Sequence, residues 1–267
     1  MRDFLLIMKR KLLVLVSILA VAVVSARDIR YAFLGDSNTW SGGVGCTQDD
    51  SWTYWFMQQF MPASCYNYAR SGATWTNTSE TLRLPLDSSA VLGPQNVVFN
   101  QALRLIRSSQ MGQPAPDVIL IMAGTNDAWF MAKRPDMWSM TVEEAFAVSE
   151  DQLAKMEPNQ AVSLASSIRL TCETLRRAFP MADIVLLTPT QTTKAENETI
   201  SRVSDIIEGC GMILGMPVVR LDGEQYISSK QESRQLTFTK DGVHTNRSGA
   251  RRIGLKIASL TNKYGVR

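Results

Sequence analysis

The sequence predicts one doubly wound α/β domain built around a five-stranded parallel sheet. Five short apolar or β-branched runs alternate with longer segments of helical periodicity, which is typical of consecutive βαβ units. These runs lack the polar alternate residues of a half-exposed strand, so we expect helices to cover both faces of the sheet. With 267 residues, 45% of them hydrophobic, the chain can form a sizeable core, and no repeat or low-complexity linker marks a second domain.

Each expected element follows from its local pattern. The runs expected to form strands are residues 30–34, 65–69, 118–123, 184–188 and 218–221. Helical patterns cover residues 51–60, 96–109, 161–179 and 200–214. In the last helix Ile253, Ile257 and Leu260 recur at helical spacing and form an apolar face that can pack on the sheet. Residues 128–160 are less regular, and we expect them to form an insertion near the active site.

Residues 1–26 have the layout of a secretory signal peptide. Basic residues 9–11 precede an uncharged apolar run of 13 residues, 12–24, and the small residues Ser25 and Ala26 follow it. The run is shorter than the ~20 residues that span a bilayer, so we expect cleavage after Ala26 and a secreted or periplasmic domain of residues 27–267. The alternative is an uncleaved membrane anchor, because residues 4–8 could lengthen the apolar stretch. Met8 is an alternative start.

The net charge of +3 resides in this expected leader. Residues 1–26 contain four basic side chains and one acidic side chain, which leaves 24 of each sign in the remainder. A neutral domain gives no electrostatic reason to expect binding to nucleic acid, and we expect no stable membrane insertion after cleavage. The single histidine, His244, excludes multi-histidine zinc sites and is the only imidazole available as a base.

The four cysteines, Cys46, Cys65, Cys172 and Cys210, all follow the expected cleavage site, where an exported protein meets an oxidising environment. Pairing Cys46 with Cys65 and Cys172 with Cys210 is the sequence-local choice among three connectivities. The alternative, which the sequence supports equally, is that the cysteines remain free, buried thiols.

Polar residues gather directly after the expected strands. The first run ends in Gly-Asp-Ser-Asn-Thr at 35–39, the second in Arg-Ser-Gly-Ala at 70–73 and the third in Gly-Thr-Asn-Asp at 124–127, while Asp-Gly-Val-His precedes the last helix at 241–244. Reactive groups of open parallel sheets gather at the carboxyl ends of the strands. We therefore expect these four blocks to form one site.

The blocks contain the groups needed for nucleophilic catalysis. Serine is a weak nucleophile until a base takes its proton, and Ser37 with His244 supplies that pair. One tight turn can bring Asp241 onto the Nδ1–H of His244, which fixes the tautomer and leaves Nε2 free to accept the proton. The backbone N–H groups of Ser37 and Gly72 and the side-chain amide of Asn126 are candidate oxyanion donors. Such catalysis requires no metal and no organic cofactor.

In this order, the four blocks resemble the SGNH (GDSL-type) hydrolases, a family of serine esterases and lipases. The resemblance implies a flavodoxin-like three-layer α/β/α fold, with Ser37 as nucleophile, Gly72 and Asn126 as oxyanion residues, and Asp241 with His244 as the Asp-x-x-His pair. One departure is residue 38, an asparagine where the family usually has a hydrophobic residue. Taken singly, the serine could be a helix cap and the glycine a turn residue, but together the blocks favour catalysis.

The sequence therefore predicts an exported serine ester hydrolase that acts through an acyl-enzyme on a small-molecule or glycan ester. Carbohydrate O-deacetylation is the first hypothesis, because Trp40, Trp75 and Trp129 lie close to the blocks and could bind a sugar ring. The alternatives are a lipase-like or short-chain carboxylesterase, an acyltransferase, and a non-catalytic carbohydrate-binding module that has kept the fold.

Overall fold

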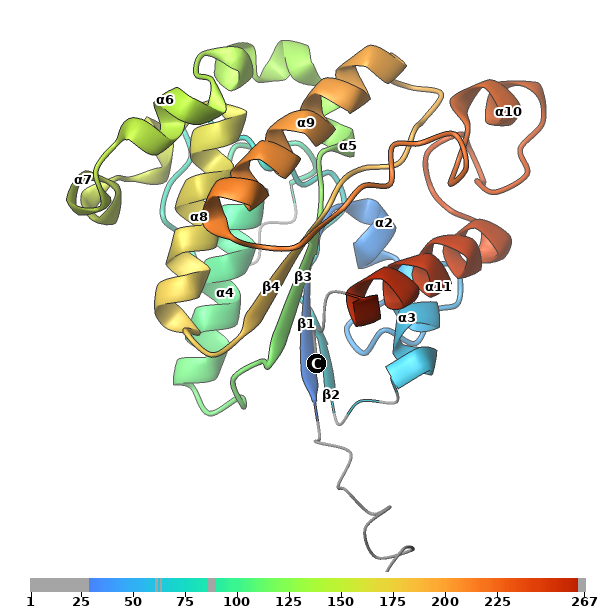
Figure 1. Ribbon diagram of the computed structural model, residues 1–267, viewed down its shortest axis with the longest axis horizontal. Helices are drawn as coiled ribbons and strands as arrows, with labels where there is room; N and C mark the ends of the chain where they lie inside the picture. The colour runs from blue at the N-terminus through green and yellow to red at the C-terminus, as the bar shows by residue number, and fades with distance from the viewer. Residues whose placement is uncertain (1–28, 61, 63, 86–89, 264–267) are drawn as a thin grey trace, which may run out of the picture.

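The centre of the protein is a sheet of five parallel strands in the order β2-β1-β3-β4-β5 (Figure 1). The computed structural model describes residues 29–60, 62, 64–85 and 90–263. The strands are β1 (Arg30–Gly35), β2 (Ser64–Asn67), β3 (Val118–Met122), β4 (Asp183–Leu187) and β5 (Val218–Val219). The central pair, β1 and β3, is in register from Tyr31 opposite Val118 to Gly35 opposite Met122. The predicted five-stranded parallel sheet is confirmed.

Helices cover both faces of this sheet, so alternate strand residues enter different cores. Helices α4 (Val98–Gln110), α8 (Leu164–Ala178) and α9 (Asn197–Leu214) lie on one face, and α3 (Trp52–Phe60) and α11 (Arg247–Lys263) lie on the other (Figure 1). In β1, Ala32 and Leu34 pack in the first core, whereas Tyr31 and Phe33 pack in the second with Trp52. All five side chains are at most 1% exposed. The three-layer α/β/α fold is therefore confirmed, and the double coverage explains why the strands are apolar throughout.

The observed elements begin and end within a few residues of the predicted ones. The second strand ends at Asn67 instead of Ala69, because the Asn67 side chain accepts a hydrogen bond from the Ala69 N–H (3.0 Å) and turns the chain out of the sheet. The fifth strand ends at Val219 instead of Leu221; it is an edge strand that pairs only with β4 among the described strands. Helix α8 begins where the Ser163 side chain accepts a hydrogen bond from the N–H of Ser166.

The irregular segment at residues 128–160 folds into short helical pieces. They include α6 (Val142–Ala147), α7 (Glu150–Lys155) and three 3-10 turns, Met131–Lys133, Pro135–Trp138 and Pro158–Gln160. Met137 and Ala145 enter the core beside α8. Arg169 of α8 donates hydrogen bonds to the backbone oxygens of Ala145 (2.6 Å) and Val148 (2.7 Å). The segment is thus packed against the main helices.

The cysteines divide into one bonded pair and two free thiols. Cys46 and Cys65 form a disulfide that ties the loop before α3 to β2. Cys172 of α8 and Cys210 of α9 are free and buried, and burial raises the pKa of both thiols. One of the two sequence-local pairs is therefore present and the other is not.

The predicted leader, residues 1–26, lies outside the described residues. Within the part of the chain that the structure describes, no helix is both long and apolar enough to cross a bilayer.

Candidate active site

Ser37 lies at the carboxyl edge of the sheet, where it is the first residue of the short helix α2 (Ser37–Trp40) that follows β1. The strand order reverses at β1, with β2 on one side and β3 on the other, and such a switch point leaves a crevice at the strand ends. Asp36 caps α2, because its Oδ1 accepts a hydrogen bond from the N–H of Asn38 (3.1 Å). The geometry of the strand-to-helix turn therefore determines where the serine hydroxyl points.

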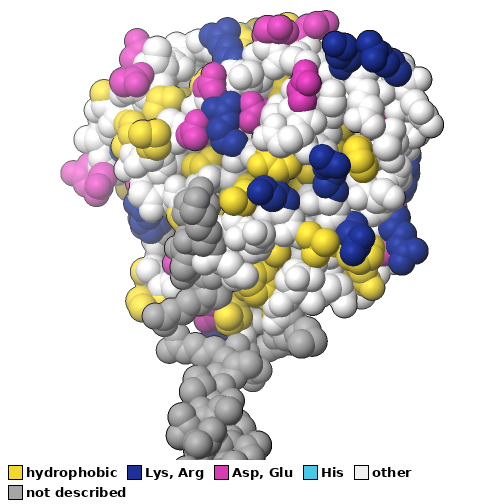
Figure 2. All heavy atoms as spheres, turned by 45° about the vertical axis from the view of Figure 1, so that its right-hand side comes forward, with side chains coloured by type: hydrophobic (Ala, Val, Ile, Leu, Met, Phe, Trp, Pro, Cys, Tyr) yellow, Lys and Arg dark blue, Asp and Glu magenta, His cyan; other side chains and the backbone are white. Residues whose placement is uncertain are grey.

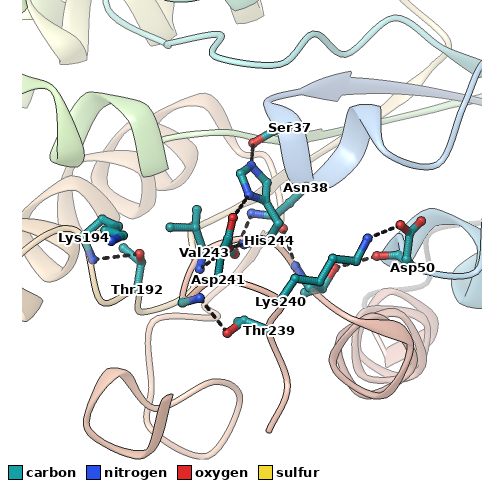
Figure 3. A network of polar contacts seen from close by, with 12 residues as sticks. Ser37, Asn38, Asp50, Thr192, Lys194, Thr239, Lys240, Asp241, Val243 and His244 are labelled. Carbon is teal, nitrogen blue, oxygen red and sulfur yellow. Dashed lines mark hydrogen bonds and ion pairs between the residues drawn. The ribbon is translucent and has the colours of Figure 1, made fainter. Parts of the chain in front are cut away.

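The single histidine lies between this serine and a carboxylate (Figure 3). His244 Nε2 is 3.0 Å from Ser37 Oγ, and His244 Nδ1 is 2.7 Å from Asp241 Oδ2. The other oxygen of Asp241 accepts hydrogen bonds from the N–H groups of Val243 (3.0 Å) and His244 (2.8 Å), which closes the tight turn that the spacing predicts. An acceptor at Nδ1 favours the tautomer that carries its proton there, so Nε2 can accept the serine proton.

The same hydrogen bonds keep Asp241 ionised. Partial burial pushes the pKa of this carboxyl upward, but the hydrogen bonds from the His244 ring and from the two backbone N–H groups outweigh burial, and the pKa lies below its ordinary value of 3.8. Asp241 therefore carries its negative charge throughout the neutral range. That charge can stabilise an imidazolium on His244 when the ring takes up a proton.

Three donors are candidates for binding an oxyanion beside Ser37. Neither the Ser37 N–H nor the Gly72 N–H donates a hydrogen bond to another described residue. Asn126, in α5 (Thr125–Trp129), donates one hydrogen bond from Nδ2 to the backbone oxygen of Ala73 (2.9 Å), which holds its carboxamide beside the turn that contains Gly72. The second Nδ2 proton is left for a ligand.

Gly72 has a backbone conformation that suits glycine. Its φ is +75°, and a Cβ atom at this position would lie 2.4 Å from Val91 Cγ1 and 3.0 Å from the Leu92 nitrogen. Two contacts hold this turn at the edge of the sheet: the Arg70 N–H donates to the Gly35 oxygen (3.1 Å), and the Asn126 amide binds Ala73.

Two buried carboxylates beside the site contribute to its structure. Asp127 accepts hydrogen bonds from the N–H groups of Trp75 (3.0 Å) and Thr76 (2.9 Å) and from the Thr76 hydroxyl (2.6 Å), so it fixes the loop after β2. Burial raises the pKa of Asp36 to about 6, although the hydrogen bond from Asn38 opposes the shift. Its Oδ2 has no hydrogen-bond partner among the described residues.

A cleft with a volume of about 570 Å³ opens over Ser37 and His244. Most of the residues in its wall have polar side chains, and they come from α2 and Ser41, the loop before α3, Ser71, Lys240, Asp241, His244 and Thr245. Lys240 forms an ion pair with Asp50 at this wall (Figure 3). Within the described ranges, no group of three His, Cys, Asp or Glu side chains could hold a metal ion.

The three tryptophans proposed for substrate binding have different environments. Trp40 lines the cleft and is 48% exposed. Trp75 is completely buried in the core beside α4, so it has no surface for a ligand and is withdrawn as a substrate-binding residue. Trp129 stacks on Phe130, with ring centroids 4.5 Å apart, and is not part of the cleft wall.

The 128–160 segment begins within α5, two residues after the candidate oxyanion residue Asn126, and its nearness to the active site stays a prediction. All of its residues are described, and none of them lines the cleft. Its apolar side chains are held against α8 and α9 instead.

Sequence reasoning missed Gln48, Asp50 and Lys240, which line the cleft. Lys240 directly precedes Asp241, so its position beside the Asp-x-x-His block was a usable signal. Gln48 and Asp50 belong to a loop that the Cys46–Cys65 disulfide ties to β2, and no local pattern marks them.

Comparisons with known proteins agree with this fold. Residues 31–257 match a family model described as GDSL-like lipase/acylhydrolase. No curated protein matches the chain. Similar solved structures include a possible lipase from Chitinophaga pinensis, which is 14% identical with a TM-score of 0.58 and covers 90% of this chain and 100% of its own. A member of the lipolytic G-D-S-L family from Veillonella parvula is 12% identical, with a TM-score of 0.50, and the match covers 88% of this chain and 99% of the other. An acetyl xylan esterase is 16% identical, with a TM-score of 0.54, and the match covers 87% of this chain and 99% of the other.

At these identities the solved structures show similarity of fold alone. The family model, however, spans most of the chain and includes the residues from Ser37 to His244. The predicted resemblance to the SGNH (GDSL-type) hydrolases is thereby confirmed. The chain belongs to the GDSL-like lipase/acylhydrolase family of esterases and lipases.

Proposed function

We propose that this protein is a serine ester hydrolase in which Ser37 is the nucleophile, His244 is the proton carrier and Asp241 orients and stabilises the imidazole. The observation that carries the proposal is the continuous chain of contacts from Ser37 Oγ to His244 Nε2 (3.0 Å) and from His244 Nδ1 to Asp241 Oδ2 (2.7 Å). Nucleophile, base and orienting group in this order are what an unreactive hydroxyl needs to attack a carbonyl carbon.

The reaction has two halves. In the first, Ser37 Oγ bonds to the ester carbonyl carbon while its proton passes to His244 Nε2; the bond to the alcohol oxygen then breaks, and that oxygen takes the proton from Nε2. In the second, a water molecule gives a proton to Nε2 and attacks the acyl carbon. The bond to Ser37 Oγ breaks, Oγ recovers the proton, and the carboxylic acid leaves.

Each half passes through a tetrahedral intermediate with a negative oxygen. The N–H groups of Ser37 and Gly72 and the second Nδ2 proton of Asn126 are the donors proposed to bind it. Within the described part of the chain these N–H groups have no other hydrogen-bond partner, which supports this role, because donors that are free and held in place gain a bond as the charge develops.

A carbohydrate ester with a small acyl group, such as an O-acetyl group, is the proposed substrate. Trp40 is the large apolar side chain of a cleft wall otherwise rich in hydroxyl, amide and charged groups, a combination suited to stacking and hydrogen bonding with a sugar. The fold shared with an acetyl xylan esterase gives modest support. On the face shown in Figure 2, apolar side chains lie in groups among polar and charged ones.

Export is part of the same proposal. Its support is the basic, apolar and small-residue order of residues 1–26 together with the Cys46–Cys65 disulfide, since disulfides persist in oxidising compartments. Expression of the full chain in a secreting host, followed by N-terminal sequencing, should give Arg27 as the first residue of the exported protein. Retention of residues 1–26 on a membrane-bound product would show an anchor instead.

Hydrolysis of p-nitrophenyl acetate by wild type, Ser37→Ala and Ser41→Ala tests the chemistry. Ser41 also lines the cleft, so its variant is a matched control. We expect activity to be lost in Ser37→Ala and largely retained in Ser41→Ala, because the Ser51 hydroxyl still binds the Asn38 oxygen when the Ser41 hydroxyl is removed. Wild type should show a burst of p-nitrophenol if the acyl-enzyme accumulates. Equal activity in wild type and Ser37→Ala would overturn the proposal, and an inactive wild type would favour a binding module.

The substrate class is tested by comparing acetylated oligosaccharides with p-nitrophenyl esters of increasing acyl length. We expect acetyl esters to be hydrolysed fastest. Trp40→Ala should lower kcat/KM for the glycan about tenfold, which corresponds to ~1.4 kcal/mol, while leaving p-nitrophenyl acetate nearly unaffected. Faster hydrolysis of long-chain esters would instead identify a lipase-like enzyme.

A further inference from the structure

Asn38 connects the helix that carries Ser37 to both sides of His244. Its Oδ1 accepts a hydrogen bond from the Thr245 N–H (3.1 Å), and its Nδ2 donates one to the Val243 oxygen (3.4 Å) (Figure 3). Asn38 is 3% exposed and is not part of the cleft wall. Its carboxamide therefore faces the backbone on either side of the histidine.

The other end of this connection is firmly held. The Asn38 N–H donates to Asp36 Oδ1 (3.1 Å), while the Asn38 backbone oxygen accepts hydrogen bonds from the Ser51 hydroxyl (2.9 Å) and the Ser41 hydroxyl (3.2 Å). The asparagine thus has little freedom to follow the 243–245 segment if that segment moves. It can restrain the segment instead.

Three hydrogen bonds join α2 to residues 241–246 among the described residues, and Asn38 makes two of them. The third is the bond between Ser37 and His244, which must change during catalysis because the proton moves along it. Of these three bonds, only the two made by Asn38 can persist throughout the reaction. The other bonds of the segment lead away from α2: the Thr245 hydroxyl donates to the Asp50 backbone oxygen (2.8 Å), and the Gly242 oxygen accepts a hydrogen bond from the Thr193 N–H (3.0 Å).

We propose that Asn38 is a positioning residue for the reaction: it keeps His244 Nε2 within reach of Ser37 Oγ by holding the backbone on both sides of the histidine. The inference rests on the proposed function of Ser37 and His244. It predicts an effect on kcat and not on KM, because Asn38 lies outside the cleft wall and its loss leaves the substrate contacts in place.

The first test compares Asn38→Leu with Asn100→Leu. Asn100 is also 3% exposed and also bridges two backbone groups, accepting from the Leu84 N–H (3.1 Å) and donating to the Gln95 oxygen (3.0 Å), but it touches neither Ser37 nor residues 241–246. We expect Asn38→Leu to lower kcat for p-nitrophenyl acetate by about 10- to 100-fold at unchanged KM, a size typical of misplacing a catalytic group by about 1 Å. Asn100→Leu should keep kcat within about threefold of wild type while losing similar thermal stability.

The second test combines Asn38→Leu with His244→Ala. If Asn38 acts through the imidazole, the double variant should have the residual activity of His244→Ala alone, since effects of groups that act as one unit are not additive. A full further loss in the double variant, or equal losses of kcat in Asn38→Leu and Asn100→Leu, would overturn the inference.

The third readout uses the fact that His244 is the only histidine in the chain, so its imidazole signals need no assignment in a nitrogen-15 NMR spectrum. The neutral ring should show a protonated Nδ1 in both proteins, because Asp241 still accepts from it, and the Nε2 signal should shift in Asn38→Leu as the hydrogen bond from Ser37 is lost. An unchanged Nε2 signal together with an unchanged kcat would refute the role of Asn38. Unimpaired activity in Ser37→Ala and His244→Ala would instead refute the proposed function, so the two failures are distinguishable.

Discussion

Asn126→Ala tests whether the site binds an oxyanion. The carboxamide of Asn126 is nearly buried, uses one Nδ2 proton to hold the Ala73 oxygen at 2.9 Å and leaves the other proton free. Removal of one preorganised oxyanion donor typically raises the barrier by about 2.7–4 kcal/mol, so we expect kcat to fall by about 10² to 10³. Loss of the bond to Ala73 should also lower the free energy of unfolding by about 1 kcal/mol.

Asn77→Ala is the matched control for this experiment. Asn77 is 1% exposed and donates one side-chain hydrogen bond, to the Ala161 oxygen at 3.1 Å, but its hydrogen bonds among the described residues reach neither Ser37 nor the turn that contains Gly72. Both variants should lose similar stability, measured by chemical denaturation, and only Asn126→Ala should lose kcat on p-nitrophenyl acetate. A kcat for Asn126→Ala within tenfold of that for Asn77→Ala would refute the assignment of Asn126 as an oxyanion donor.

Three further predictions concern the surroundings of the site. Gly72→Ala should lower kcat at least tenfold, because a Cβ atom would force the neighbouring backbone to move. The control is Gly215→Ala, at φ +64° with open space around it, which should lower the free energy of unfolding by only about 1–2 kcal/mol. Equal activities of the two variants would argue against a role for the Gly72 N–H. Burial raises the pKa of Asp36 from 3.8 to about 6, so its protonated form stabilises the fold at low pH and this contribution is lost as pH rises from about 4 through 6. The free energy of unfolding of Asp36→Asn should therefore increase relative to that of wild type over this pH range. A difference between the two proteins that stays constant with pH in chemical denaturation would contradict this. Cys46→Ser should lower the free energy of unfolding by about 3 kcal/mol, since the disulfide to Cys65 closes a loop with a sequence separation of 19. If the variant remains less stable than wild type when both are measured under reducing conditions, the loss has another cause.

Much of the fold could be predicted from local patterns, because both faces of the sheet are covered. A strand buried on both sides must be apolar at every position, as residues 118–122 are, and such a run stands out from the amphipathic helices around it. The ends of the elements were less predictable. The second strand ends where the Asn67 side chain bonds to Ala69, and the fifth is short because it pairs on one side only, and neither contact has a signature in composition or periodicity.

Trp40 and Trp75 show the same contrast between what local sequence predicts and what only the folded chain decides. Trp40 and Trp75 both follow predicted strands at short distance, and nothing in their neighbours distinguishes them. In the folded chain one ring remains half exposed at the cleft and the other is enclosed between the sheet and α4. The difference depends on the direction of each side chain relative to the sheet, which is set by packing between distant segments.

By itself, the sequence determined which reactive groups the protein has and roughly where they lie along the chain. One histidine, an aspartate three residues before it, and a serine directly after a buried strand leave little choice of mechanism, because the chemistry depends on residue type and local spacing. The tertiary structure alone decided how those groups are held and what surrounds them. The Asn38 bonds across 205 and 207 residues, the cleft wall from Asp50 and Lys240, and the burial of Trp75 all join segments far apart in sequence, and such contacts exist only when the sheet brings the strand ends together.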